Sequence, residues 1–364
     1  ELARLMQDNH GRATFGATGL DEDLEMIRDQ FRRYADERVI PNAHEWHLKD
    51  QLIPMEIIEE LAELGVFGLT IPEEYGGLGL SKASMVVVTE ELSRGYIGVG
   101  SLGTRSEIAA ELILCGGTEA QKAKWLPALA SGEILSTAVF TEPNTGSDLG
   151  SLRTRAVRDG DDWVITGSKQ WITNGPYADY AMIFAITDPD LVAQRRGGIT
   201  GFFVETAWQG FDVVSPIPIM GHLGSEIGIL SFDGLRVPDR YRLGEVDQGL
   251  KVALKGVNTG RLGLSATCVG LARWALVRAV DYARVRKTFG QPIGGHQAVQ
   301  MLLAQSASDI YAAETMLVDC ALKLERGERA LAETSMVKQH CTDAANRVFD
   351  RCIQVHGGMG LTNE

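Results

Sequence analysis

DWVITGSKQWIT, residues 162–173, decides the fold class, because it is a long β-rich run in a chain whose two ends are helical. Other short β-rich runs, separated by Gly, Asn, Asp and Pro, lie at 136–141, 180–187, 199–205 and 229–237. Residues from about 135 to 244 are therefore predicted to form a mostly antiparallel β domain. Within it, DPDLVAQRRGG, residues 188–198, is predicted to be an exposed polar loop.

Both flanks of this β region have the periodicity of amphipathic helices. On the N-terminal side, Leu24, Ile27 and Phe31 recur at spacings of three and four. The same spacing recurs on the C-terminal side through Leu303, Ile310, Ala313, Leu317 and Leu324. The sequence predicts an α+β fold of three domains: an N-terminal helical domain over 1–134, a middle β domain over 135–247, and a C-terminal helical domain over 248–364 that is cut short.

Charge and composition exclude several classes of protein. With 35 Lys and Arg against 48 Asp and Glu, the 364 residues carry a formal charge of −13, which opposes attraction to nucleic acid or to an anionic membrane. The sequence contains no run of about 20 apolar residues. Its five cysteines form neither a CxxC nor a Cys/His cluster, so we expect a cytoplasmic protein without a metal site.

One candidate ligand turn is TEPNTGSD, residues 141–148, which follows a β-rich run. Thr141 and Ser147 offer hydroxyls, and Gly146 frees the backbone for a close approach. A plain hairpin connection stabilised by Asx-type turns explains the same residues.

A second candidate is KQWITNG, residues 169–175, where alternation along a strand predicts Trp171 and Thr173 on one face. An indole beside a hydroxyl would suit a planar heteroaromatic ring. The alternative interpretation is that Trp171 packs in the core.

Two further motifs lie in the C-terminal helices. RVRKTFGQP, residues 284–292, is a cationic helix end that would suit a diphosphate, although bases at a helix C-terminus also offset its dipole. QVHGGMG, residues 354–360, permits a close backbone approach, although a GG pair is also an ordinary helix terminator.

Taken together in this order, the four motifs resemble the acyl-CoA dehydrogenase flavoprotein family, and the similarity covers nearly the whole chain from about Asp21. Within the family, residues 94–114 and 44–79 look most like the branch that acts on methylsuccinyl-CoA. The resemblance implies a C-terminal four-helix bundle, a homo-oligomer (dimer or tetramer), and FAD held between the β domain and the C-terminal helices.

The resemblance also implies roles for the motif residues. The backbone at Phe140 and Thr141 would face the pyrimidine side of the flavin, with Gly146 and Ser147 near pyrophosphate or CoA. Trp171 would pack on the isoalloxazine ring and Thr173 would hydrogen-bond its N5 region. The residues implied to hold the ADP half, largely across a subunit interface, are Arg286, Thr288, Phe289, Gln297, Gln354, Gly357 and Gly358.

The implied reaction removes two hydrogens from neighbouring carbons of an acyl-CoA: a carboxylate takes the α-proton and the β-hydrogen leaves as hydride to flavin N5. One branch of the family has its base where this chain has Gly260, so we expect the base glutamate beyond Glu364, in a longer polypeptide. Arg261 matches the supporting arginine beside the base, where a cation favours an ionised carboxylate; a surface helix charge is the alternative. Ser147, Asn258 and Arg261 are expected to contact substrate.

The acyl pocket of the family is lined near residues 98–108, where this chain has the polar Thr104, Arg105 and Ser106. A buried guanidinium is costly without an anion, so these residues favour a short branched dicarboxylyl-CoA such as methylsuccinyl-CoA. The alternative is that Arg105 points outward or pairs with a protein carboxylate such as Glu107. A second departure is IMGHLGSE, residues 219–226, where the family often has Lys and Arg beside a similar glycine.

The resemblance implies an electron-transfer flavoprotein as the electron acceptor. Two other readings remain open. An acyl-CoA oxidase or flavin monooxygenase on the same fold would return its electrons to oxygen. A non-catalytic assembly subunit would account for the absence of a base from these 364 residues.

Overall fold

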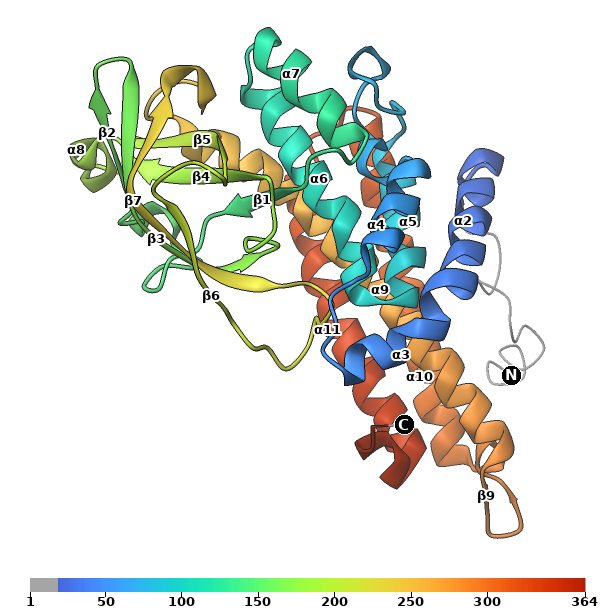
Figure 1. The fold of residues 1–364 in the computed structure, drawn as a ribbon. Helices are drawn as coiled ribbons and strands as arrows, with labels where there is room; N and C mark the ends of the chain where they lie inside the picture. The colour runs from blue at the N-terminus through green and yellow to red at the C-terminus, as the bar shows by residue number, and fades with distance from the viewer. Residues whose placement is uncertain (1–18, 364) are drawn as a thin grey trace. The chain divides into compact units, whose positions relative to one another are not determined.

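A computed structural model describes residues 19–363, and Figure 1 traces its elements. The chain forms two compact units, each assembled from segments that are separate in the sequence. The helical unit comprises residues 19–48, 81–101 and 261–363; the sheet unit comprises 49–80 and 102–260. The three-domain division remains a prediction, and residues 1–18 and 364 of its terminal domains lie outside the described range.

An eight-stranded sheet is the centre of the sheet unit, with strand order β6-β7-β3-β2-β4-β5-β8 and β1 paired to β4. The pairs β1/β4 and β2/β4 are parallel and the others antiparallel, which confirms the prediction of a mostly antiparallel β region (Figure 1). The strands are β1 (Ser136–Val139), β2 (Arg155–Asp159), β3 (Asp162–Thr173), β4 (Tyr180–Ile186), β5 (Ile199–Glu205), β6 (Phe211–Pro216), β7 (Ile227–Pro238) and β8 (Arg242–Leu243).

The predicted polar loop at 188–198 is wrong in one respect, because it contains the short helix α8 (Pro189–Ala193). The Asp188 side chain accepts hydrogen bonds from the N–H groups of Asp190 and Leu191 at 2.9 and 3.0 Å. An aspartate N-cap followed by proline in the first turn is a favourable helix start, and it outweighs the loop-like composition.

Besides α8, the described residues of the sheet unit include α4 (Met55–Glu63), α7 (Glu119–Ala130), α6 (Ile97–Gly116) from residue 102 onward, and α9 (Gly249–Val285) as far as residue 260. The indole of Trp125 on α7 meets the Phe203 ring of β5 edge-on, with centroids 4.8 Å apart. Short 3₁₀ turns lie at Val66–Gly68, Glu73–Tyr75, Leu149–Ser151 and Asp239–Tyr241.

The helical unit is built mainly on long helices whose apolar faces meet. The side chains of Leu303, Ile310, Ala313 and Leu317 are buried and Leu324 is partly buried, which confirms the predicted face. Its elements are α2 (Glu22–Tyr34), a π turn (Ala35–Val39), α3 (Ile40–Leu48), α5 (Lys82–Gly95), α9 (Gly249–Val285) from residue 261, β9 (Lys287–Thr288), β10 (Gln291–Pro292), α10 (Gln297–Glu325) and α11 (Leu331–His356), with 3₁₀ turns at Ile293–Gly295 and Gly357–Leu361.

No helix within residues 19–363 combines the length and the hydropathy needed to span a bilayer.

Candidate active site

The polar turn at 141–148 is closed by its own backbone and tied to the sheet by a buried ion pair. Glu142 and Thr145 exchange backbone hydrogen bonds of 2.8 and 3.1 Å. The buried Glu142 carboxylate lies 3.0 Å from Nζ of Lys169 on β3. It also accepts hydrogen bonds from the N–H groups of Arg153 and Thr154, at 2.6 and 3.1 Å. The turn is closed by the bridge between Glu142 and Thr145, but it is not a hairpin connection, because the strands on either side of it, β1 and β2, both pair with β4 in parallel and not with each other. Its position is fixed from inside the protein.

Lys169 is fully buried, and sequence reasoning missed it. Its ammonium donates hydrogen bonds to the carbonyl oxygens of Phe140 (3.1 Å) and Phe184 (2.8 Å) as well as facing Glu142. Burial lowers the pKa of Lys169 to about 8, although the charge of Glu142 opposes that shift. For Glu142, burial favours the neutral acid, but Lys169 and the N–H donors outweigh it and lower the pKa of the carboxyl.

Alternation along β3 was the signal that could have found Lys169. Trp163 and Ile165 point into the core, so the same parity places Lys169 inside. The same parity would also bury Trp171. The register with β7 shifts between Lys169 and Ile172, and Trp171 adopts φ +62, which marks a β-bulge.

The bulge exposes the indole that the sequence singled out. Trp171 is 53% exposed and Ile172 takes the buried position, so the core-packing alternative for Trp171 is wrong. Thr173 is half-buried, and its hydroxyl has no hydrogen-bond partner within residues 19–363. The N–H of Gln170 donates to the carbonyl of Thr141 at 2.9 Å, so the structure brings the two polar turns together.

These residues fit a planar heteroaromatic group such as a flavin. An exposed indole offers an apolar face, and the Thr173 hydroxyl remains available to a ring nitrogen or its proton. At Gly146, a Cβ atom would meet nothing within 4 Å, so the 141–148 turn leaves open space where the pyrophosphate is expected. The Phe140 ring instead stacks on Phe184 (4.8 Å, 9°), which leaves its backbone as the part that could face a ligand.

Arg105 lies on α6 with most of its side chain covered. Its Nε is buried and has no hydrogen-bond partner, and no carboxylate within the described residues lies in ion-pair range. The suggested pairing with Glu107 is not formed, since that carboxylate accepts a hydrogen bond from the Thr70 hydroxyl. Burial lowers the pKa of the guanidinium, and Tyr177 opposes this shift. Beside Arg105, Thr104 is buried with its hydroxyl unpartnered, and Ser106 is also buried.

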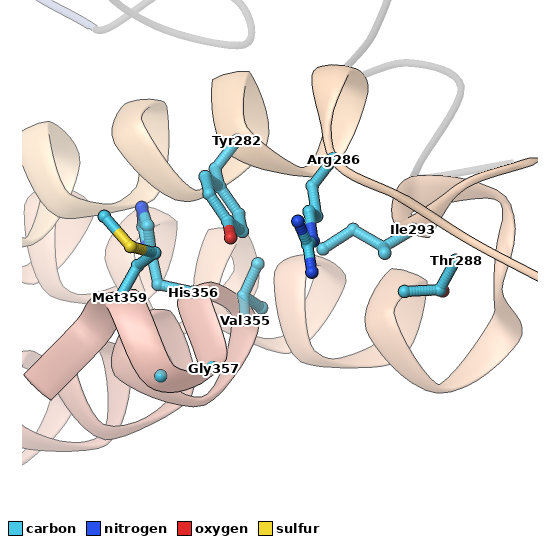
Figure 2. Close-up of a pocket in the computed structure, with 9 residues that line it drawn as sticks. Tyr282, Arg286, Thr288, Ile293, Val355, His356, Gly357 and Met359 are labelled. Carbon is cyan, nitrogen blue, oxygen red and sulfur yellow. The ribbon is translucent and has the colours of Figure 1, made fainter.

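A cavity of ≈ 450 Å³ lies in the helical unit, where α9 ends beside the end of α11 (Figure 2). In Figure 2, Tyr282 near the end of α9 and Arg286 directly after it extend toward the segment that carries Val355 and His356. The Tyr282 and His356 rings are 4.7 Å apart. The complete lining is Tyr282, Arg286, Thr288, Ile293, Val355, His356, Gly357, Gly358 and Met359.

The chemistry of this cavity fits the phosphate-bearing half of a dinucleotide. Its lining contains the guanidinium of Arg286 and no carboxylate. Gly357 has φ +59, and a Cβ at Gly357 or Gly358 would meet nothing within 4 Å, so side chains there would fill the space that a ligand needs.

The predicted ADP-binding residues divide into two groups. Arg286, Thr288, Gly357 and Gly358 line the cavity, whereas Phe289, Gln297 and Gln354 do not. Phe289 is 97% exposed on the β9–β10 hairpin, at φ +51. Sequence reasoning missed Tyr282, four residues before Arg286 on the same helical face, and His356, which directly precedes the glycine pair.

The expected catalytic neighbourhood on α9 carries no acid at Gly260. A Cβ there would lie 3.1 Å from Cδ1 of Ile108, so this position leaves little room for a side chain. Arg261 is half-buried and donates to the Ser335 hydroxyl at 3.5 Å. Asn258 is half-buried in the sheet unit, and Ser147 is exposed.

Family models match most of the chain. The acyl-CoA dehydrogenase N-terminal domain matches residues 21–133, the middle domain 137–235 and the C-terminal domain 247–364. Over 374 aligned residues, the chain is 54% identical to (2S)-methylsuccinyl-CoA dehydrogenase of Cereibacter sphaeroides, covering 100% of this chain and 68% of that protein.

Solved structures of similar fold support the same family assignment. A chain from the structure of the electron transferring flavoprotein of Acidaminococcus fermentans superposes with a TM-score of 0.91 at 33% identity, covering 96% of this chain and 91% of that one. Glutaryl-CoA dehydrogenase from Mycobacterium smegmatis in complex with FADH2 gives 0.88 at 31% identity, covering 94% and 86%. The matches confirm the resemblance drawn from the sequence and the α+β fold that it implies.

Proposed function

Because the chain belongs to the acyl-CoA dehydrogenase family, an FAD-dependent family of oxidoreductases, we propose that it dehydrogenates a short branched dicarboxylyl-CoA such as methylsuccinyl-CoA. The observation that carries the substrate class is Arg105. Among residues 19–363, the buried Nε of this guanidinium has no partner and no carboxylate lies in ion-pair range, which suits a substrate that brings its own carboxylate. The 54% identity to a methylsuccinyl-CoA dehydrogenase supports the same substrate.

Different residues of the chain would bind different parts of FAD. Trp171 and Thr173 would hold and orient the flavin ring, and Phe140, Thr141, Gly146 and Ser147 would form its polar edge. Arg286, Thr288, Gly357 and Gly358 would hold the ADP half, with Phe289, Gln297 and Gln354 acting on a neighbouring subunit's cofactor. FAD, when bound, supplies a hydride acceptor for the β-hydrogen.

Proton abstraction requires a carboxylate that we assign to no residue of this chain. Gly260 has no side chain with which to accept a proton. We place the base glutamate beyond Glu364, with Arg261 supporting its ionised form and Asn258 and Ser147 contacting the thioester. Thr104 and Ser106 flank Arg105 on α6 and would complete the polar end of the acyl site.

We propose an electron-transfer flavoprotein as the acceptor of the electrons, a homo-oligomer as the working state, and the cytoplasm as its location. The match to a chain in an electron transferring flavoprotein structure supports the first. All five cysteines are free, which agrees with a reducing compartment. An oxidase is the alternative on this fold, and it would recover its yellow colour rapidly in air after anaerobic bleaching by substrate.

The substrate class is tested by Arg105→Ala, assayed on methylsuccinyl-CoA and on butyryl-CoA, which lacks the carboxylate. We expect kcat/KM to fall about 100-fold or more on methylsuccinyl-CoA, because the distal anion loses a desolvated partner, and about threefold or less on butyryl-CoA. Butyryl-CoA turnover is the control for folding and flavin content. An equal loss on both substrates contradicts the proposal.

A further inference from the structure

The loop at residues 219–226, here called the histidine loop, is held at its end and places one imidazole in an unusual backbone conformation. The N–H of Ile53 donates to the carbonyl of Gly224 at 3.1 Å, and the N–H of Asn174 donates to that of Glu226 at 2.7 Å. His222 has φ +58, a left-handed conformation that is uncommon for any residue other than glycine. Its ring is half-buried. A residue kept in this conformation is a candidate for a functional position.

The imidazole acts electrostatically on the same cluster as Arg105. Burial, and then the charge of Arg105 on α6, lower the pKa of His222. Tyr177, in the turn after β3, in turn opposes the lowering of the Arg105 pKa by burial. Besides burial, the charge of Glu226, at the end of the histidine loop, raises the pKa of Tyr177. Burial raises the pKa of Tyr177 to about 12, so it stays a neutral hydroxyl, donating to the Asn174 side chain at 2.6 Å. Arg105, His222, Tyr177 and Glu226 are therefore electrostatically linked.

This part of the sheet unit contains buried groups that can donate a hydrogen bond but lack a partner among the described residues. Three buried groups have no hydrogen-bond partner among the described residues: Arg105 Nε, the Thr104 hydroxyl and the Ser225 hydroxyl. Leaving such groups unsatisfied costs free energy, and an anion with several acceptor sites would satisfy them. Ser225 belongs to the histidine loop, so the unmet donors lie on both of the segments that the electrostatic coupling joins.

We propose that His222 is a second contact for the distal carboxylate of the substrate, beside Arg105, and that it takes up a proton from the solvent when this carboxylate binds. The inference rests on the proposed function, since it needs a dicarboxylyl substrate. One proton moves from buffer to the imidazole, and no other bond is made or broken. His222 thereby becomes a specificity-determining residue that discriminates a carboxylate end from a methyl end.

The electrostatics of the free protein agree with this order of events. Burial, and then the charge of Arg105, lower the pKa of His222 below its ordinary 6.5, so the ring is neutral at neutral pH. A carboxylate placed between the two groups would favour the protonated ring and raise that pKa. Binding of a carboxylate ligand should then strengthen as the pH falls toward 6, whereas binding of a neutral acyl group should not.

The test measures binding of two thioesters that lack an α-proton and therefore cannot react: 2,2-dimethylsuccinyl-CoA and its neutral match, 2,2-dimethylbutyryl-CoA. Calorimetric titration of the holoenzyme at pH 7, in two buffers of different ionisation enthalpy, gives the protons taken up per ligand. We expect uptake with the carboxylate ligand and none with the neutral one. His222→Asn, chosen because asparagine tolerates φ > 0, should abolish the uptake and weaken the carboxylate ligand about tenfold at pH 6.5.

His47→Asn, at an exposed position on α3, is the matched control and should behave as wild type. Proton uptake that persists in His222→Asn, or that equals the uptake with the neutral thioester, overturns the inference. Arg105→Ala separates the two levels of the argument. If Arg105→Ala selectively weakens the carboxylate ligand and His222→Asn does not, only the role of His222 fails. If Arg105→Ala weakens both ligands equally, the substrate class itself fails.

Discussion

At the scale of single residues, Lys169 holds together the backbone beside the candidate flavin site. Its ammonium donates hydrogen bonds to the carbonyls of Phe140 and Phe184 and pairs with Glu142. The Glu142 carboxylate in turn accepts hydrogen bonds from two N–H groups of the segment that leads into β2. Both members of the ion pair, Lys169 and Glu142, are buried. The charge of Lys169 therefore connects β3 with the end of β1 and with the turn at 141–148.

Lys169→Met should reduce the free energy of unfolding by about 3–5 kcal/mol, because it leaves a buried carboxylate and two carbonyls without their cation. Urea unfolding followed by circular dichroism measures the loss. The double variant Lys169→Met/Glu142→Gln removes the stranded charge and should recover part of the stability. A loss below about 1 kcal/mol in the single variant would show that the pair is not a determinant of stability.

The exposure of Trp171 could be predicted only in part from the sequence. The sequence identified the indole and the Thr173 hydroxyl as a pair and left core packing as the alternative. Strict alternation from Trp163 and Ile165 favours that alternative, and only the bulge before Ile172 reverses it. The bulge depends on the register with β7, a partner some 60 residues away, which local pattern does not encode.

At the scale of elements, a buried charge cluster joins four helices of the helical unit. Arg28 on α2 and Arg273 on α9 face Glu90 and Glu91 on α5 and Glu314 on α10. Arg28 and the two α5 carboxylates are completely buried, and Nε and Nη1 of Arg28 have no hydrogen-bond partner among the described residues. Buried networks of this kind fix how helices pack more than they stabilise the fold.

Glu314→Gln should change the pH dependence of stability. Burial first, and then the charge of Glu90, raise the pKa of Glu314 to about 7, against 4.5 in an unfolded chain. Between these values the unfolded carboxyl has released its proton and the folded one keeps it, so wild type loses stability as the pH rises through this window. The variant does not titrate there.

Urea unfolding at pH 5 and at pH 8 measures this effect. The stability of wild type relative to Glu314→Gln should fall by roughly 1–3 kcal/mol between the two pH values. Asp319→Asn, which removes an exposed carboxylate on α10 that pairs with Lys323, is the control and should show no such trend. A difference independent of pH would contradict the raised pKa.

Elements were predictable where one face is apolar. The α10 face and the long strands β3, β4 and β7 follow directly from periodicity. β2 (RAVRD) and β6 (FDVVSP) were not predicted, because each buries a single residue and otherwise presents exposed side chains. Their strand structure comes from pairing with β3 and β7, which is a tertiary effect.

At the scale of the whole molecule, the residues proposed to bind FAD divide between the two compact units. Trp171 and Thr173 belong to the sheet unit, and Arg286 and the glycine pair belong to the helical unit. The sequence could predict both sets only through the family resemblance, because residues more than 100 positions apart have no local pattern in common. Composition and spacing alone left each motif with an ordinary structural explanation.

Phe289→Asp should weaken subunit association and FAD retention together. The ring is almost wholly exposed at the β9–β10 hairpin, and the neighbouring Val285 is 73% exposed, beside the cavity that Arg286 lines. Exposed apolar side chains next to a ligand site are typical of a surface that a partner covers. If a neighbouring subunit shares the ADP half, an aspartate introduced there would disfavour both the apolar contact and the approach of a diphosphate.

Light scattering after size exclusion, with the ratio of flavin to protein absorbance across a dilution series, measures both effects. Wild type should keep FAD until dilution dissociates the oligomer, and Phe289→Asp should lose both at higher concentration. Val157→Asp is the matched control, since Val157 is 64% exposed on β2 of the sheet unit. Because FAD binding and subunit association would be linked, adding excess FAD should restore the oligomer of the variant. If Phe289→Asp instead keeps both its oligomer and its full flavin content, the ADP half is bound by one subunit alone.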